Sequence, residues 1–299
     1  MNRLKYSWFQ LTFGQEETYL YPEKSYERLK RFGYDAIELT PPKGKYGGGV
    51  SLEKFVLIHR KLSAKFGLEV SCINECWGEK WDPYSPNFKA LTDKKASDLV
   101  VREVKEDIDI AAELKAPFVT CAITTHIDIT KQNVKEYTEV AVDTLREIAD
   151  YAKAKNVRIV LEATNHLEMG KYINTILNHK KLIKLTGKDN IGIQIDWFHV
   201  NIEELNPYET VMDAQPYLWH MHFRDSNSLT PGYGTIDFKA VIRAIKKTNY
   251  SGFCTLESAP LFPDAEKAAR DGIEYLKLCE RIVDYQISAE YPNGYKIEL

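Results

Sequence analysis

The chain has 299 residues, of which 44% are hydrophobic and 28% charged, a composition typical of a globular protein with a large core and not of a disordered one. Its 40 basic and 43 acidic residues give a net charge of −3, which argues against a surface that binds nucleic acid or anionic membranes. No window approaches about 18 uninterrupted apolar residues, and Glu16 and Glu17 interrupt the first segment, so we expect a cytoplasmic protein without a membrane span.

Short apolar runs of strand-like composition follow one another along the chain. There are eight, at residues 5–12, 36–40, 68–75, 118–124, 158–164, 191–196, 218–225 and 252–258. Amphipathic helix-like stretches lie between and after them, at residues 25–33, 51–67, 95–114, 134–156, 173–187, 203–213, 237–249 and 265–285. Gly33 and Gly67 follow two of these stretches, as expected of helix C-terminal caps. The alternation of strand and helix predicts parallel βαβ units.

These units, spaced about 35 residues apart, predict a single (β/α)8 barrel, the TIM barrel fold of the α/β class. An open doubly wound sheet should carry a glycine-rich phosphate loop after its first strand, and the sequence has none. We therefore expect residues 1–299 to form one barrel domain that ends in a polar tail at about residues 286–299. The tail could wrap the bottom of the barrel or meet a second copy, which leaves a homo-oligomer open.

Two residue types suggest little chemistry of their own. The five cysteines lack CxxC spacing, and we expect buried, reduced thiols. His59 and His179 lie on predicted helices, and we expect both at the surface.

Four strand-like runs in the second half of the chain end on side chains that can bind a metal. These are Glu162, Asp196, His222 and Glu257. A carboxylate at the end of an apolar strand is costly to desolvate, so four such endings in order indicate one shared divalent cation. Three carboxylates and one imidazole form an oxygen-rich set that favours Mn²⁺ or Mg²⁺, with Co²⁺ as an alternative.

The alternation of side chains along a strand predicts that these four residues share the inner face of the barrel. In IGIQID, Asp196 lies on the face opposite the three isoleucines, and in LWHMHFRD the same rule turns Trp219 toward the helices and His222 and Arg224 inward. Inward residues at the carboxyl ends of strands form the active-site face of such barrels. Two more inward residues have open roles. For His220 we favour a histidine of the barrel interior with its hydrogen bonds satisfied over a metal ligand. Glu38 could be a pocket residue or a salt-bridge partner.

The motifs LEATNHLE, IDWFH, HMHFRDSNSLTPGYGTIDF and TLES cover roughly the last half of the chain. They resemble the xylose-isomerase-like barrel superfamily, and more closely its ketose 3-epimerase branch, the tagatose, psicose or allulose 3-epimerases. The resemblance implies that one Mn²⁺ is bound by Glu162, Asp196, His222 and Glu257. It also implies sugar contacts by Glu168, six residues after the first ligand, and by His199, three residues after the second.

One position departs from the resemblance. The epimerases carry an arginine six residues after the metal-binding histidine, and this chain has Ser228 there. Another residue must then contact that substrate oxygen, or the substrate differs. Arg224 faces inward nearby and is a candidate substrate-binding residue, although the resemblance assigns it no role.

The implied function is a metal-dependent sugar isomerase or epimerase that acts on a ketose or a related polyol ketone. Inversion of a carbon next to a carbonyl requires that one base remove a proton and that an acid return it to the opposite face of an enediolate. We expect Glu162 and Glu257 to be this pair, with the metal as Lewis acid.

Other functions remain alternatives at this point. A metal-dependent dehydratase of the inosose or dehydroshikimate type shares the proton abstraction. A binding module without catalysis would share the ligands. An abasic-site endonuclease of the endonuclease IV type is less favoured, because it needs a three-zinc cluster and a basic surface, whereas this chain has seven histidines and is acidic. The sequence leaves the sugar, and whether it is phosphorylated, open.

Overall fold

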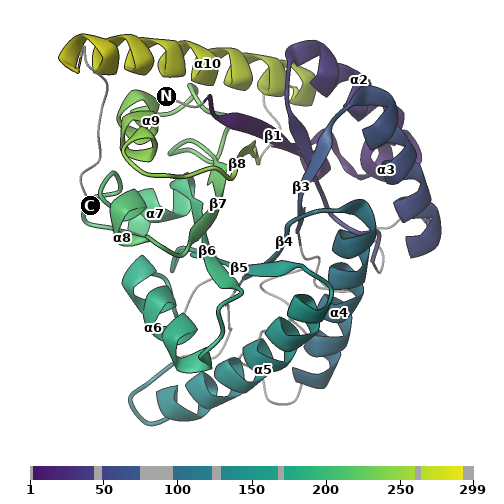
Figure 1. Ribbon diagram of the computed structural model, residues 1–299, viewed down its shortest axis with the longest axis vertical. Coiled ribbons are helices and arrows are strands. Elements are labelled where there is room, and N and C mark those ends of the chain that lie inside the picture. The colour runs from purple at the N-terminus through teal and green to yellow at the C-terminus, as the bar shows by residue number, and fades with distance from the viewer. Residues whose placement is uncertain are drawn as a thin grey trace.

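The computed structural model describes residues 3–43, 49–74, 97–122, 129–167, 172–259 and 264–291. Within these residues, parallel strands pair in chain order and β1 closes the ring against β8, so the predicted (β/α)8 barrel is confirmed (Figure 1). The strands are β1 (Lys5–Phe9), β2 (Ala36–Leu39), β3 (Glu69–Asn74), β4 (Phe118–Ala122), β5 (Arg158–Glu162), β6 (Ile191–Asp196), β7 (Leu218–Phe223) and β8 (Phe253–Leu256).

Helices surround this ring of strands, and the long C-terminal helix α10 packs against α9 and α2 (Figure 1). The helices are η1 (Gln10–Phe13, a 3₁₀ helix), α1 (Gln15–Leu20), α2 (Pro22–Phe32), α3 (Leu52–Phe66), α4 (Ser97–Leu114), α5 (Val134–Ala154), α6 (Ile176–Thr186), α7 (Trp197–Glu203), α8 (Thr210–Asp213), α9 (Phe238–Lys246) and α10 (Ala265–Glu290). None of the helices in this described part is long and apolar enough to cross a membrane.

Local sequence signals set several helix ends. Gly33 and Gly67 end α2 and α3 with φ of 80° and 63°, left-handed conformations that glycine adopts at little cost, which confirms both predicted caps. The Ser51 side chain accepts a hydrogen bond from the Lys54 backbone N–H and begins α3. Helix α10 continues to Glu290, into the segment predicted as a tail, and residues 292–299 lie outside the described part.

The prediction for Trp219 is wrong. Its side chain packs against a small cluster separate from the main core, formed by Cys72, Phe118 and Val160. The pairing of β6 with β7 shifts register between Ile193 and Gln194, and this irregularity breaks the alternation that the prediction assumed. The turned indole fits only because its neighbour is Gly192, where a Cβ atom would lie 2.3 Å from the Trp219 ring.

The two helical histidines are buried and not at the surface, so that prediction is also wrong. The Nδ1 atom of each ring has a partner that the sequence does not reveal. The Tyr26 hydroxyl lies 3.0 Å from Nδ1 of His59, and Nδ1 of His179 lies 2.9 Å from the Thr175 carbonyl. The thiols agree with prediction, since the four cysteines in the described residues are free and buried. Cys76 lies outside that part.

Candidate active site

The four predicted strand endings meet at the carboxyl end of the barrel. Glu162 and Asp196 are the last residues of β5 and β6, His222 is next to the end of β7, and Glu257 follows β8 directly. Asp196 pairs in register with His222. Because neighbouring parallel strands end at the same rim, residues far apart in the sequence become neighbours in space.

The imidazole of His222 is at the centre of this group. Its Nδ1 lies 2.9 Å from Glu257 Oε2 and 3.6 Å from Glu162 Oε1. Glu162, Asp196 and His222 each offer one ligand atom, and these atoms lie within 4.8 Å of one another. Asp196 and His222 are buried, while the side chains of Glu162 and Glu257 keep 13% and 16% of their surface exposed. The two glutamates are therefore the members of the group that an incoming molecule can reach.

The surroundings shift the pKa values of Glu162 and Glu257 in opposite directions. Burial raises the pKa of Glu162, and the negative charges of Asp196 and Glu257 add to this effect. Burial alone would also raise the pKa of Glu257, but Arg224 and His222 outweigh it and hold that pKa below its usual value. Without a bound cation, one carboxyl therefore favours the protonated form and the other the ionised form.

The donor set fits a divalent cation. Three carboxylates converge beside one imidazole nitrogen, and burial of so many like charges is costly without a compensating positive charge. Burial alone would lower the pKa of His222, but the carboxylates of Glu38 and Glu257 raise it well above its usual value. A cation next to Nδ1 would neutralise the same carboxylates.

His199 lies beside the cluster on α7, one turn after Asp196. Its Nε2 is 3.8 Å from Asp196 Oδ2. Its Nδ1 lies 2.6 Å from the amide nitrogen of Asn165, which donates to it in the tautomer that carries the ring proton on Nε2. Burial lowers the pKa of His199 to about 4, so the ring is neutral at pH 7. Asn165 was not singled out from the sequence. The signal that could have found it is its place in the loop after β5, three residues beyond Glu162.

Arg224, the residue that follows β7, approaches the cluster. Its Nη1 lies 3.3 Å from Asp196 Oδ2 and 3.8 Å from Glu257 Oε1, and its guanidinium stacks over the Phe198 ring at 4.7 Å. Nη2 donates a hydrogen bond to the Ser228 hydroxyl. Arg224, which was predicted to face inward, therefore contacts Ser228, the position at which the sequence departs from the epimerase motif. The last predicted site residue, Glu168, lies outside the described residues.

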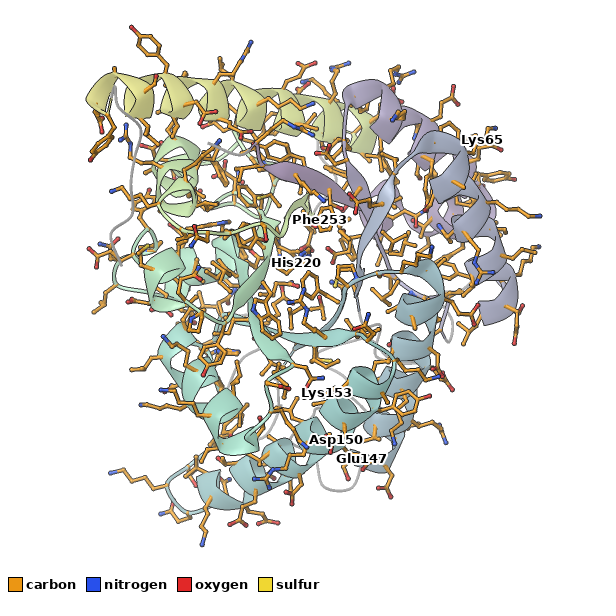
Figure 2. The ribbon with its side chains drawn as sticks, viewed as in Figure 1. Lys65, Glu147, Asp150, Lys153, His220 and Phe253 are labelled. Atoms are coloured by element: carbon orange, nitrogen blue, oxygen red, sulfur yellow. The ribbon has the colours of Figure 1, made fainter. Side chains whose placement is uncertain are left out.

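Below the cluster, the interior of the barrel carries a buried carboxylate. Figure 2 shows His220 inside the ring of strands, and both His220 and His222 contact Glu38 of β2. Of the two roles left open for Glu38, its contacts agree with the salt-bridge partner. His220, as expected, has interior partners.

Comparison with known proteins agrees with this geometry. The sequence profile described as "Xylose isomerase-like TIM barrel" matches residues 26–279. A 3-dehydro-D-guloside 4-epimerase of Escherichia coli is 30% identical over 137 residues, 46% of this chain and 52% of that protein. A D-psicose 3-epimerase of Agrobacterium fabrum is 31% identical over 116 residues, 39% of this chain and 40% of that protein. The matches thus span about half the length of these relatives or less.

A longer match covers 81% of this chain and 80% of a ketose 3-epimerase of Arthrobacter globiformis, at 24% identity. Among solved structures, an L-ribulose 3-epimerase aligns with a TM-score of 0.82 and 19% identity, covering 99% of this chain and 100% of that one. A 3-keto-D-glucoside 4-epimerase from E. coli aligns with a TM-score of 0.78 and 20% identity, covering 93% of this chain and 100% of that one. At these identities the structural likeness establishes the fold alone.

Proposed function

Because the chain belongs to the xylose isomerase-like TIM barrel family, we propose that it is a metal-dependent sugar epimerase or isomerase. The substrate class is a ketose or a related polyol ketone. The curated relatives that carry epimerase names support this class, as does the accessible pair of carboxylates in the barrel rim.

The arrangement of Glu162 and Glu257 around His222 is the observation that carries the proposal. The two carboxylates come from β5 and β8, on either side of β7, and each has an oxygen within 3.6 Å of His222 Nδ1. A substrate carbon held between them would have one carboxylate available to remove a proton and another to return it. The resulting exchange through an enediolate would invert that carbon or move the carbonyl.

The residues that would bind the metal are Glu162, Asp196, His222 and Glu257. Mn²⁺ is our first choice for this oxygen-rich set, with Mg²⁺ and Co²⁺ as alternatives. When bound, the ion would supply Lewis-acid stabilisation of the negative charge that develops on the substrate oxygens.

The protein side chains would divide the proton transfer between them. Glu257, beside Arg224, removes the proton next to the carbonyl, and the protonated carboxyl of Glu162 delivers one to the opposite face. The roles reverse in the reverse reaction. His199 Nε2–H and the Arg224 guanidinium are the donors for substrate oxygens, and Glu168 is proposed to contact a hydroxyl on the family resemblance. The cytoplasmic location and the homo-oligomer stay predictions.

A deuterium wash-in screen tests the function. The protein with Mn²⁺ would be incubated in D₂O with free and phosphorylated ketoses, and NMR would identify the carbon that exchanges. We expect exchange at a carbon next to the carbonyl, together with a new sugar isomer. Loss of water by mass spectrometry would instead assign the dehydratase reaction. Absence of exchange on every ketose, with metal bound, would refute the proposal.

A further inference from the structure

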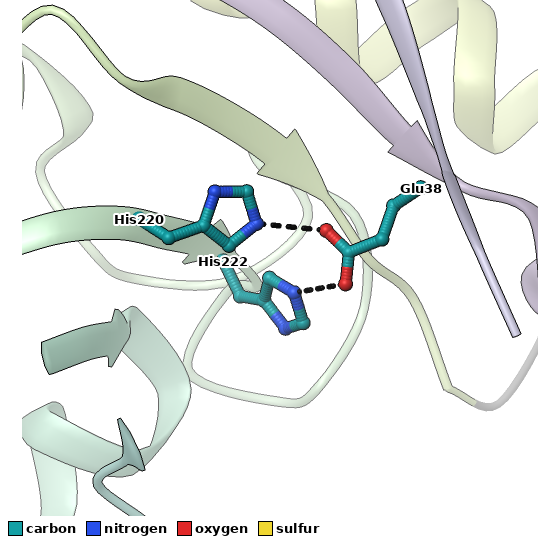
Figure 3. A group of neighbouring side chains, drawn as sticks. All are labelled: Glu38, His220 and His222. Atoms are coloured by element: carbon teal, nitrogen blue, oxygen red, sulfur yellow. Dashed lines mark hydrogen bonds and ion pairs between the residues drawn. The ribbon is translucent and has the colours of Figure 1, made fainter. Parts of the chain in front are cut away.

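The carboxylate of Glu38, on β2, bridges both histidines of β7 across the barrel interior (Figure 3). Its Oε2 lies 2.8 Å from His220 Nε2, and its Oε1 lies 2.8 Å from His222 Nε2. All three side chains are almost completely buried. A buried carboxylate is retained only when hydrogen bonds compensate its desolvation, and this one has a separate partner for each oxygen.

The surroundings complete the network. The Asn74 amide donates to Glu38 Oε1 over 3.0 Å, and the Thr255 hydroxyl lies 3.3 Å from His220 Nε2. An ionised carboxylate can only accept hydrogen bonds, so both Nε2 atoms must carry protons. For His222 this leaves Nδ1 as the nitrogen that can give up its proton and offer a lone pair to a metal, and Nδ1 is the atom that faces Glu162 and Glu257.

We propose that Glu38 is a positioning residue that acts through His222. By accepting from Nε2–H, it would fix the ring orientation and select the tautomer in which Nδ1 is a metal ligand. Hydrogen bonds of this kind to the second nitrogen of a ligating histidine raise its basicity and hold it in place. The inference rests on the proposed function, since it assumes that the rim binds a metal.

Glu38, His220 and His222 also have donor atoms close enough together for a metal of their own. The two 2.8 Å nitrogen to oxygen distances are those of charge-assisted hydrogen bonds, and an ion at Nε2 of His222 would displace its proton from Glu38. We therefore expect one metal per chain. A titration of the metal-free protein with Mn²⁺, followed by electron paramagnetic resonance, measures both the stoichiometry and Kd.

The first experiment uses the protein without substitutions. Long-range ¹H–¹⁵N spectra of histidine-labelled protein loaded with Mg²⁺ report which nitrogen of each ring carries a proton, and His222→Gln identifies the His222 signals. We expect protonated Nε2 and unprotonated Nδ1 for His222. A ring protonated on Nδ1 in the metal-loaded protein would overturn the proposal, whatever the folding of any Glu38 variant.

The second experiment compares Glu38→Gln with Glu280→Gln. Glu280 is also a buried carboxylate, but it accepts from the Leu4 backbone N–H, the Tyr6 hydroxyl and Lys246, away from the rim. We expect Glu38→Gln to raise the Kd for Mn²⁺ by about 10- to 100-fold. Glu280→Gln should lower stability and leave that Kd unchanged.

The outcomes separate the two proposals. Tight binding of one Mn²⁺ by the unsubstituted protein, with an unchanged Kd in a folded Glu38→Gln variant, would refute the role of Glu38 and leave the proposed function intact. Failure of the unsubstituted protein to bind Mn²⁺ would refute the metal site itself. Two bound ions per chain would assign Glu38 to a second metal site in place of a positioning role.

Discussion

The Arg224 guanidinium donates a hydrogen bond to the Ser228 hydroxyl, at the position where the ketose 3-epimerases that this chain resembles carry an arginine. The same guanidinium lies 3.3 Å from the Asp196 carboxylate. The positive charge that the motif lacks at residue 228 is therefore present beside the cluster, supplied from four residues earlier. This relationship gives Arg224 a defined role to test.

Arg224→Ala should lower kcat/KM by about 10- to 100-fold, the cost of removing a charged hydrogen-bond donor from a buried site. Ser228→Ala removes only the hydroxyl that Arg224 contacts, and we expect a change of a few-fold at most. Steady-state kinetics on the ketose that shows deuterium exchange would measure both. Equal losses in the two variants would assign the role to Ser228 and not to Arg224.

Glu162→Gln and Glu257→Gln should each reduce turnover by about 10²- to 10⁴-fold, because each removes one proton-transfer group while keeping the size of the side chain. Glu69→Gln is the matched control, since this exposed glutamate pairs with Lys5 at the other end of the barrel. Turnover and thermal unfolding would be measured together. Near-normal turnover in either site variant would exclude the two-carboxylate scheme.

Removal of divalent metal by a chelator should abolish turnover, and Mn²⁺ should restore it. Binding to the folded state alone would also raise the free energy of unfolding, by about 2.7 kcal/mol at a free Mn²⁺ concentration of 100 times Kd. Urea unfolding with and without Mn²⁺ measures this shift. Asp196→Asn should lose most of it, because Asp196 is a member of the ligand group. Equal stability of the unsubstituted protein in both conditions would contradict the metal site.

The burial of His59 predicts a dependence of stability on pH that is separate from the site. Burial lowers the pKa of His59 from its ordinary value of 6.5 to about 3. Below pH 6.5 the His59 imidazole therefore binds a proton in the unfolded chain but not in the folded chain. The free energy of unfolding falls as the pH decreases from 6.5 toward 3. At pH 4.5 the loss is about 3 kcal/mol.

His59→Gln should remove this part of the acid sensitivity. Urea unfolding at pH 7 and pH 4.5 would show a smaller difference between the two pH values in the variant than in the unsubstituted protein. The exposed His166 provides the control, and His166→Gln should leave the difference unchanged. A difference that His59→Gln does not reduce would show that His59 is protonated within the folded protein.

Much of the fold and the ligand group could be predicted because they depend on local periodicity. Alternating apolar residues define each strand and its inner face, and parallel strands in a closed barrel bring their carboxyl ends to one rim. Asp196 and His222 could thus be assigned to the same site without a structure. The prediction for Trp219 was wrong because parity holds only while two strands stay in register, and the irregularity between Ile193 and Gln194 is a property of the pairing.

The amino-acid sequence by itself determined which side chains reach the barrel rim and what chemistry they offer. Only the tertiary structure decided how they are paired. Glu38 is 182 and 184 residues from its two histidines, and nothing in the local sequence pattern selects these partners from the other inward residues. Barrel closure lets Glu38 on β2 reach the histidines of β7 across the barrel interior, and the cost of burying an uncompensated carboxylate then favours the hydrogen bonds that hold His222 in place.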